Sequence, residues 1–181
     1  RLWVVTGVQT CALPISVENR IPDYIASRIE AIKKDQHNGS AELALKSADI
    51  VRDTLAGNPG QNLQKTVEIA QSVIALTKTI RPTMAPIYNL MDQIQEIIDQ
   101  YFDTSSEVEI SGLVREIDKH IFKVKEDRHQ VIKNAAKLMT SGKTILTHSF
   151  SSTINRVFRF NQERNINVYV SESRPVRERT R

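Results

Sequence analysis

Apolar residues recur every three or four positions from Ile21 to Leu138, the spacing that places them on one face of an α-helix. The pattern stops at the polar run 33–39, at the Gly-Asn-Pro-Gly turn 57–60, and at Arg81-Pro86, which contains two prolines. We therefore expect five helices, over residues 21–32, 42–55, 62–79, a fourth with its helical period over 90–101, and 106–139.

The apolar faces of these helices predict one helical bundle over residues 17–140, and Ser40 can cap its second helix. The residues expected on the buried faces are Ile21, Ile25, Ile29, Ile32, Leu45, Ala48, Leu55, Leu63, Val67, Ala70, Val73, Ile74, Leu76, Thr77, Leu90, Met91, Ile94, Ile97, Ile98, Tyr101, Leu113, Ile117, Ile121, Val124, Val131, Ala135 and Leu138.

The periodicity changes after Ser141-Gly142. Residues 144–146 favour a strand, a short helix follows with Ser151 or Ser152 as its cap, and Asn167–Ser171 favours a second strand. The predicted fold class is therefore mixed α and α/β. An N-terminal helical bundle precedes one βαβ unit, which over residues 141–181 is the truncated start of a Rossmann-like parallel-sheet domain, because two strands alone do not make a stable sheet.

The two strands of a βαβ unit are parallel, so their carboxyl ends lie side by side. This places Thr147–Ser152 next to Ser171–Pro175, in the kind of crevice where open α/β sheets bind ligands. Hydroxyl groups and the unpaired N–H groups of a helix N-terminus also favour an anion such as phosphate at the first of these turns. The alternative is that its serines and threonines only cap a helix.

Composition and charge change this picture little. The chain is 40% hydrophobic and 25% charged, without a membrane-spanning run or a signal-peptide layout, so we expect a cytoplasmic protein without membrane contact. The net charge is +4, but residues 171–181 carry four arginines against two glutamates, and Arg1 adds one more positive charge. Because the rest of the chain is nearly neutral, a nucleic-acid partner is not expected.

The first sixteen residues resemble a translated sequencing-library adaptor of the kind found in metagenomic assemblies. We expect them to be a disordered artefact, and the protein to be an environmental fragment. Cys11, the only cysteine, lies in this segment. The rest of the chain can therefore form neither a disulfide nor a thiolate site. We expect no metal and no cofactor, because phosphate-binding glycine motifs are missing and the histidines are scattered, at His37, His120, His129 and His148.

Four patches of the chain resemble the translation initiation factor 2B alpha/beta/delta superfamily, which includes methylthioribose-1-phosphate isomerase and archaeal ribose-1,5-bisphosphate isomerase. The patches are Gly39–Leu45, Arg81–Ala85, Ile145–Thr153 and Val168–Pro175, in the family's order and rough spacing. The resemblance implies a helical domain followed by a Rossmann-like domain, with a phosphosugar pocket between them lined by these patches.

The resemblance also implies a set of ligand-binding residues. Gly39 and Ser40 match a turn that meets a ligand phosphate, while Arg81 and Arg174 match two Arg-Pro positions whose guanidinium groups suit phosphate oxygens. Salt bridges are the alternative for both arginines. Glu172 would orient Arg174 or meet a sugar hydroxyl. The rest of the implied pocket wall is Thr147, His148, Ser149, Ser151 and Ser152.

One departure from the family bears on catalysis. The isomerases have a cysteine where this chain has Ser149, and a serine hydroxyl is a much weaker acid and nucleophile than a thiol. The family's partner aspartate would lie beyond Arg181. At 177–181 the chain also departs from the usual Glu-Gly-Arg. We therefore expect no catalytic residue in this fragment.

The sequence thus favours a non-enzymatic, initiation-factor-2B-like regulatory protein of archaeal or environmental origin. It would bind a phosphorylated sugar or a nucleotide monophosphate and form a homo-oligomer through the remainder of its α/β domain. The alternative is an aldose–ketose sugar-phosphate isomerase of the ribose-1,5-bisphosphate type. An RNA-binding helical protein, a third hypothesis, does not fit the charge distribution.

Overall fold

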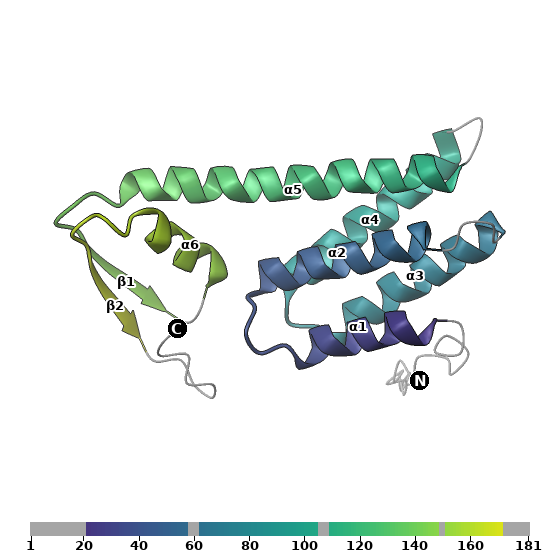
Figure 1. Ribbon diagram of the computed structural model, residues 1–181, viewed down its shortest axis with the longest axis horizontal. Coiled ribbons are helices and arrows are strands. Elements are labelled where there is room, and N and C mark those ends of the chain that lie inside the picture. Colours follow the sequence, from purple (N-terminus) through teal and green to yellow (C-terminus); the bar gives the residue numbers. More distant parts are fainter. Residues whose placement is uncertain (1–20, 58–61, 105–108, 149–150, 172–181) are drawn as a thin grey trace, which may run out of the picture.

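The structure is a computed structural model that describes residues 21–57, 62–104, 109–148 and 151–171. It is mostly helical, with a small parallel sheet near the C-terminal end (Figure 1). The elements, in chain order, are α1 (Asp23–Lys34), α2 (Ser40–Ala56), α3 (Leu63–Ile80), α4 (Ala85–Thr104), α5 (Ile110–Leu138), β1 (Thr144–His148), α6 (Ser152–Phe160) and β2 (Asn167–Ser171).

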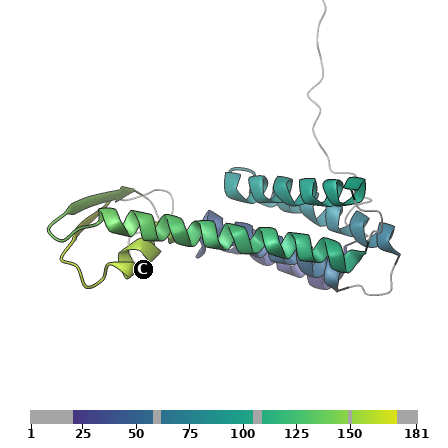
Figure 2. The ribbon, with the colours of Figure 1, turned by 90° about the horizontal axis from the view of Figure 1, so that it is seen from above.

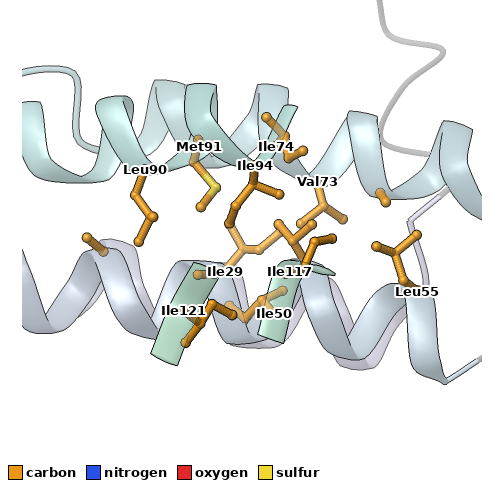
Figure 3. Packing of buried hydrophobic residues seen from close by; sticks show 14 of the residues in the cluster. Ile29, Ile50, Leu55, Val73, Ile74, Leu90, Met91, Ile94, Ile117 and Ile121 are labelled. Carbon is orange, nitrogen blue, oxygen red and sulfur yellow. The ribbon is translucent and has the colours of Figure 1, made fainter. Parts of the chain in front are cut away.

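The five predicted helices are present, and α2 is the central one, because it packs against α1, α3, α4 and α5. Isoleucine, leucine and valine side chains from all five helices meet in one cluster (Figure 3). Ile94, Leu113 and Ile117 are fully buried within it. Removing so many branched apolar side chains from water is the main force that holds the bundle together.

The start of α2 differs from the prediction. Ser40 is the first helical residue, and the N-cap is Gly39. The backbone of Gly39 is extended, and no side chain caps the helix at this position. The Gly39 carbonyl accepts the first hydrogen bonds of the helix, from the N–H groups of Glu42 and Leu43 at 3.0 and 3.1 Å. The prediction that Ser40 caps this helix was therefore wrong, because the glycine already supplies the turn.

The βαβ unit agrees with its prediction. β1 and β2 are parallel, in a register that runs from Thr144 opposite Asn167 to His148 opposite Ser171. A second hydrophobic cluster holds the unit against the end of α5, and its buried residues are Ile132, Ala136, Met139 and Val157. The predicted domain boundary at residue 140 stays a prediction, but the last turns of α5 pack with the βαβ unit and not with the bundle.

The long helix α5 spans both parts of the molecule (Figures 1 and 2). Val131 and Leu138, predicted on its buried face, are 56% and 80% exposed, whereas Ile132 and Ala136 are buried. Val124, at the start of the predicted stripe, still packs against the bundle core, and a repeat of seven residues drifts by only about 20° per repeat around a straight helix. The buried stripe shifts by one position where α5 changes its packing partner.

Replacing Leu113 with alanine should lower the free energy of unfolding by about 2–5 kcal/mol, because the side chain is fully buried in the bundle. Leu138→Ala, the same change near the other end of α5, should alter it by less than about 0.5 kcal/mol, because Leu138 is exposed. Urea unfolding of both variants measures the difference. Equal losses would contradict the assignment of the buried face.

Candidate functional site

Two helix starts meet where the bundle faces the βαβ unit. A Cβ atom on Gly39 would lie 2.7 Å from Ser152 Oγ, 3.1 Å from Ser152 Cβ and 3.2 Å from Ser152 N. The turn before α2 therefore packs directly against the first residue of α6, and only a residue without a side chain allows this approach. In Figure 1 the N-terminal end of α2 faces α6.

Serine hydroxyls line the start of α6. Ser151 is the N-cap, and its Oγ accepts a hydrogen bond from the Ile154 N–H at 3.4 Å, which confirms one of the two predicted caps. The first-turn N–H groups of a helix have no carbonyl partners within the helix, and the helix dipole makes this end positive. At the junction of α2 and α6, two such ends lie against each other.

The carboxyl ends of the two strands also lie together. His148 Nδ1 and Ser171 Oγ are 2.6 Å apart, and the Ser171 hydroxyl also donates to the Thr147 carbonyl at 3.4 Å. Thr147 and His148 therefore lie beside Ser171, the first residue of the segment 171–175 that is predicted to face them. Ser149, Glu172 and Arg174 lie outside the described residues, so their proposed contacts stay predictions.

Arg81 lies at the C-terminal end of α3 and holds the end of α1. Its guanidinium donates to the carbonyls of Lys33, at 2.8 Å, and of Ile32 and Asp35. The carbonyls at the end of a helix lack their regular helical partners, and here Arg81 adds to the single bond that the Ile32 carbonyl accepts from the Asp35 N–H at 3.3 Å. Within the described residues the structure therefore assigns Arg81 a capping contact, and its role as a phosphate ligand stays a prediction.

Asp35 extends this contact to the loop before Gly39. Its carboxylate accepts from the N–H groups of His37 and Asn38 at 2.8 and 2.9 Å, and from the Asn38 side chain at 2.7 Å. Burial raises the pKa of Asp35, but the hydrogen bonds from Asn38, His37 and Lys46 outweigh it and hold the pKa well below its usual range. An ionised Asp35 thus fixes the turn that leads into α2.

A cluster of charged residues beside Gly39 was missed in the sequence. Glu42 Oε2 accepts from Arg128 Nη1 of α5 at 2.9 Å and from Arg156 Nη2 of α6 at 3.1 Å. Arg128 Nη2 also donates to Ser152 Oγ at 3.2 Å. We call these four residues, Glu42, Arg128, Ser152 and Arg156, the junction cluster. It joins α2, α5 and α6 beside the contact between Gly39 and Ser152.

The hydrogen bond from Arg128 lowers the pKa of Glu42; burial opposes this, and the positive charges of Arg128, Arg156 and Lys46 reinforce it. Glu42 is therefore ionised at neutral pH. One sequence signal could have identified Arg128. It lies four residues from Ile132 on the buried stripe of α5, where a charged side chain needs a partner. Arg156 has no comparable signal.

The site presents hydroxyl groups, backbone N–H groups and arginines, which are groups that bind an anion. Among the described residues, no group of three or more His, Cys, Asp or Glu side chains is placed to hold a metal ion. No helix in the described part of the chain is long and apolar enough to cross a membrane.

Gly39→Ala should lower the free energy of unfolding by about 1–3 kcal/mol, because its Cβ would overlap Ser152. Adding Ser152→Gly removes both the hydroxyl and the Cβ that obstruct it. In a double-mutant cycle measured by urea unfolding, Gly39→Ala should therefore cost less in the Ser152→Gly background than in the wild type. Purely additive losses would mean that the two turns do not touch.

Comparison with known proteins agrees with this arrangement of elements. A curated translation initiation factor eIF-2B subunit 2-like protein from Pyrococcus horikoshii is 25% identical over 159 residues, which are 86% of this chain and 52% of that protein. The crystal structure of the Pyrococcus horikoshii OT3 translation initiation factor eIF-2B superposes with a TM-score of 0.67 and 20% identity, over 87% of this chain and 54% of that one.

A second solved structure with the same fold is 5-methylthioribose 1-phosphate isomerase from Pyrococcus horikoshii OT3. Its TM-score is 0.63 at 12% identity, over 81% of this chain and 51% of that one. The chain spans about half the length of these relatives. The profile of the Initiation factor 2 subunit family matches residues 30–181, so the chain belongs to the Initiation factor 2 subunit family.

Proposed function

We propose that this chain carries part of a non-catalytic, regulatory binding site for a phosphorylated sugar or a nucleotide monophosphate. The proposed site lies beside the point where the turn at Gly39-Ser40 touches the turn at Thr147–Ser152. The observation that carries the proposal is the contact between these turns, in which the Gly39 Cβ position lies 2.7 Å from Ser152 Oγ.

The chemistry of both turns suits a phosphate group. Each turn opens a helix, so each brings unpaired N–H groups and the positive end of a helix dipole to this contact. Ser40 and Ser151 add hydroxyl groups. We expect the guanidinium of Arg174 to supply the positive charge that balances the negative charge of the phosphate. Arg81 contributes by holding the loop before Gly39.

The relatives support the same ligand class. One protein of this fold is named for a sugar phosphate, 5-methylthioribose 1-phosphate, as its substrate. Others are named as translation initiation factor eIF-2B, including a tetrameric beta2-delta2 complex from C. thermophilum. We extend the ligand class of the first protein to this chain, and we propose for it a regulatory role in place of the isomerase activity, as a relative of the initiation factors.

Ser149 is the reason for proposing binding without catalysis. A serine hydroxyl has a much higher pKa than a cysteine thiol, so at neutral pH it supplies neither a thiolate nor an easily released proton without a base beside it. The other groups proposed to bind phosphate, which are helix N–H groups, serine hydroxyls and Arg174, do not require a thiol at this position. Loss of the thiol therefore removes the chemistry and leaves the binding groups in place.

The wider organisation completes the proposal. We propose that the βαβ unit belongs to a Rossmann-like domain, which would continue the sheet beyond β1 and β2. The outward face of this small sheet exposes Leu146 and Tyr169, at 76% and 63%, as expected for a face that further elements cover. Homo-oligomers in the cytoplasm, formed through that domain, are the assembly that we propose.

The full gene product should be stabilised by at least one compound from a panel of AMP, ribose 5-phosphate and ribose 1,5-bisphosphate. At a ligand concentration 100 times its Kd, the gain is about 2.7 kcal/mol, which raises the Tm by several degrees. Arg174→Ala should reduce this shift, whereas Arg159→Ala, which removes an exposed arginine from the last turn of α6, should leave it unchanged. Absence of a shift with every compound would refute the site.

The second candidate, a ribose-1,5-bisphosphate isomerase, rests on the fold that this chain shares with a sugar-phosphate isomerase. The same preparation tests it when incubated with ribose 1,5-bisphosphate. Formation of the ketose, lost in Ser149→Ala, would replace the non-catalytic proposal with this one. Binding without turnover supports the proposal as stated.

A further inference from the structure

The junction cluster is the only described contact in which one carboxylate oxygen joins three helices. Glu42 Oε2 receives one hydrogen bond from α5 and one from α6, while Glu42 itself lies in the first turn of α2. Apolar packing elsewhere is divided between two separate clusters, one in the bundle and one beneath the sheet. The cluster thus lies between the two cores, where little apolar packing fixes their relative position.

Arg128 occupies the centre of this contact. Its side chain is only 11% exposed, and its two terminal nitrogens point to different partners, Nη1 to Glu42 and Nη2 to Ser152. A guanidinium holds such a fork rigidly because it is planar, whereas an ammonium group is a single point of charge. Arg128 therefore fixes the distance between Glu42 and Ser152.

Burial makes this geometry demanding. Removing an arginine and a carboxylate from water is costly, and the cost is offset only when their hydrogen bonds are well formed. Arg128 Nε, also buried, has no hydrogen-bond partner among the described residues. The cluster therefore has few alternative arrangements, because by moving Arg128 would lose its ion pair with Glu42 and its hydrogen bond to Ser152.

We propose that Glu42 and Arg128 are positioning residues that hold the start of α6 against Gly39, and so set the spacing between the two ligand-binding turns. Arg156 is the outer member of the cluster, since its side chain is 54% exposed. This inference rests on the proposed function for its ligand role, but the positioning itself is a property of the free protein.

Hydrogen exchange of the ligand-free chain, followed by mass spectrometry, tests the positioning. Glu42→Gln should speed exchange of the hydrogen-bonded amides of α6, from Asn155 onward, by at least about fivefold, which corresponds to the lower end of typical coupling between sites. The matched control is Glu30→Gln, which also removes a carboxylate that contacts two cations, Lys33 and Lys34, but within α1 alone. It should leave α6 unchanged.

Arg128→Lys separates positioning from charge. The variant keeps the positive charge beside Glu42 but cannot reach Glu42 and Ser152 with a rigid fork. We expect faster exchange in α6, an unchanged urea midpoint for the bundle, and at least about fivefold weaker affinity for each of AMP, ribose 5-phosphate and ribose 1,5-bisphosphate that the wild type binds. Normal exchange in α6, or an equal loss of protection throughout the chain, would overturn the inference.

The ligand measurements separate this inference from the proposed function. If α6 loosens in both variants but the wild-type protein binds none of AMP, ribose 5-phosphate and ribose 1,5-bisphosphate, the proposed function fails and the positioning contact stands. If the wild type binds and both variants bind with the same affinity, the ligand role of Glu42 and Arg128 is refuted while the site remains.

Discussion

The structure depends on one helix that must serve two hydrophobic cores. With its 29 residues, α5 is roughly 44 Å long. Its first half packs Leu113, Ile117 and Ile121 into the bundle, and its last turns pack Ile132 and Ala136 under the sheet. Because a helix is stiff over this length, the βαβ unit is placed relative to the bundle by the direction of α5 and by the contacts between α6 and α2.

Those contacts are polar, which distinguishes the junction from either core. Apolar side chains would give a larger and less directional gain, whereas the fork of Arg128 and the carboxylate of Glu42 specify an orientation. Gly39 completes this arrangement by letting two backbone turns touch. Tight backbone contact and directional hydrogen bonds therefore fix a geometry that burial alone would leave loose.

Much of the fold could be predicted from the sequence because, in the bundle, the apolar residues that recur with helical spacing are also the buried ones. Ile25, Ile29 and Ile32 recur on one face, and all three are buried. The strand–helix–strand order and the cap at Ser151 followed from local signals as well. Val131 and Leu138 were misplaced because their face depends on which core α5 packs against, which a single helix pattern does not contain. Glu42 and Arg156 are 114 residues apart, so their contact needs the tertiary structure.

The proposed function separates binding from chemistry within one site. Phosphate is held by N–H groups, hydroxyls and guanidinium groups, and many of these are backbone groups that substitution of one side chain leaves intact. Proton transfer on a sugar needs one group of suitable pKa at one place, which a serine at position 149 does not supply without an activating base. A fold that builds its pocket from helix starts can therefore lose an activity through one residue and retain its ligand. With the function that we propose, the chain would be suited to sense a metabolite, because it would bind the ligand without consuming it.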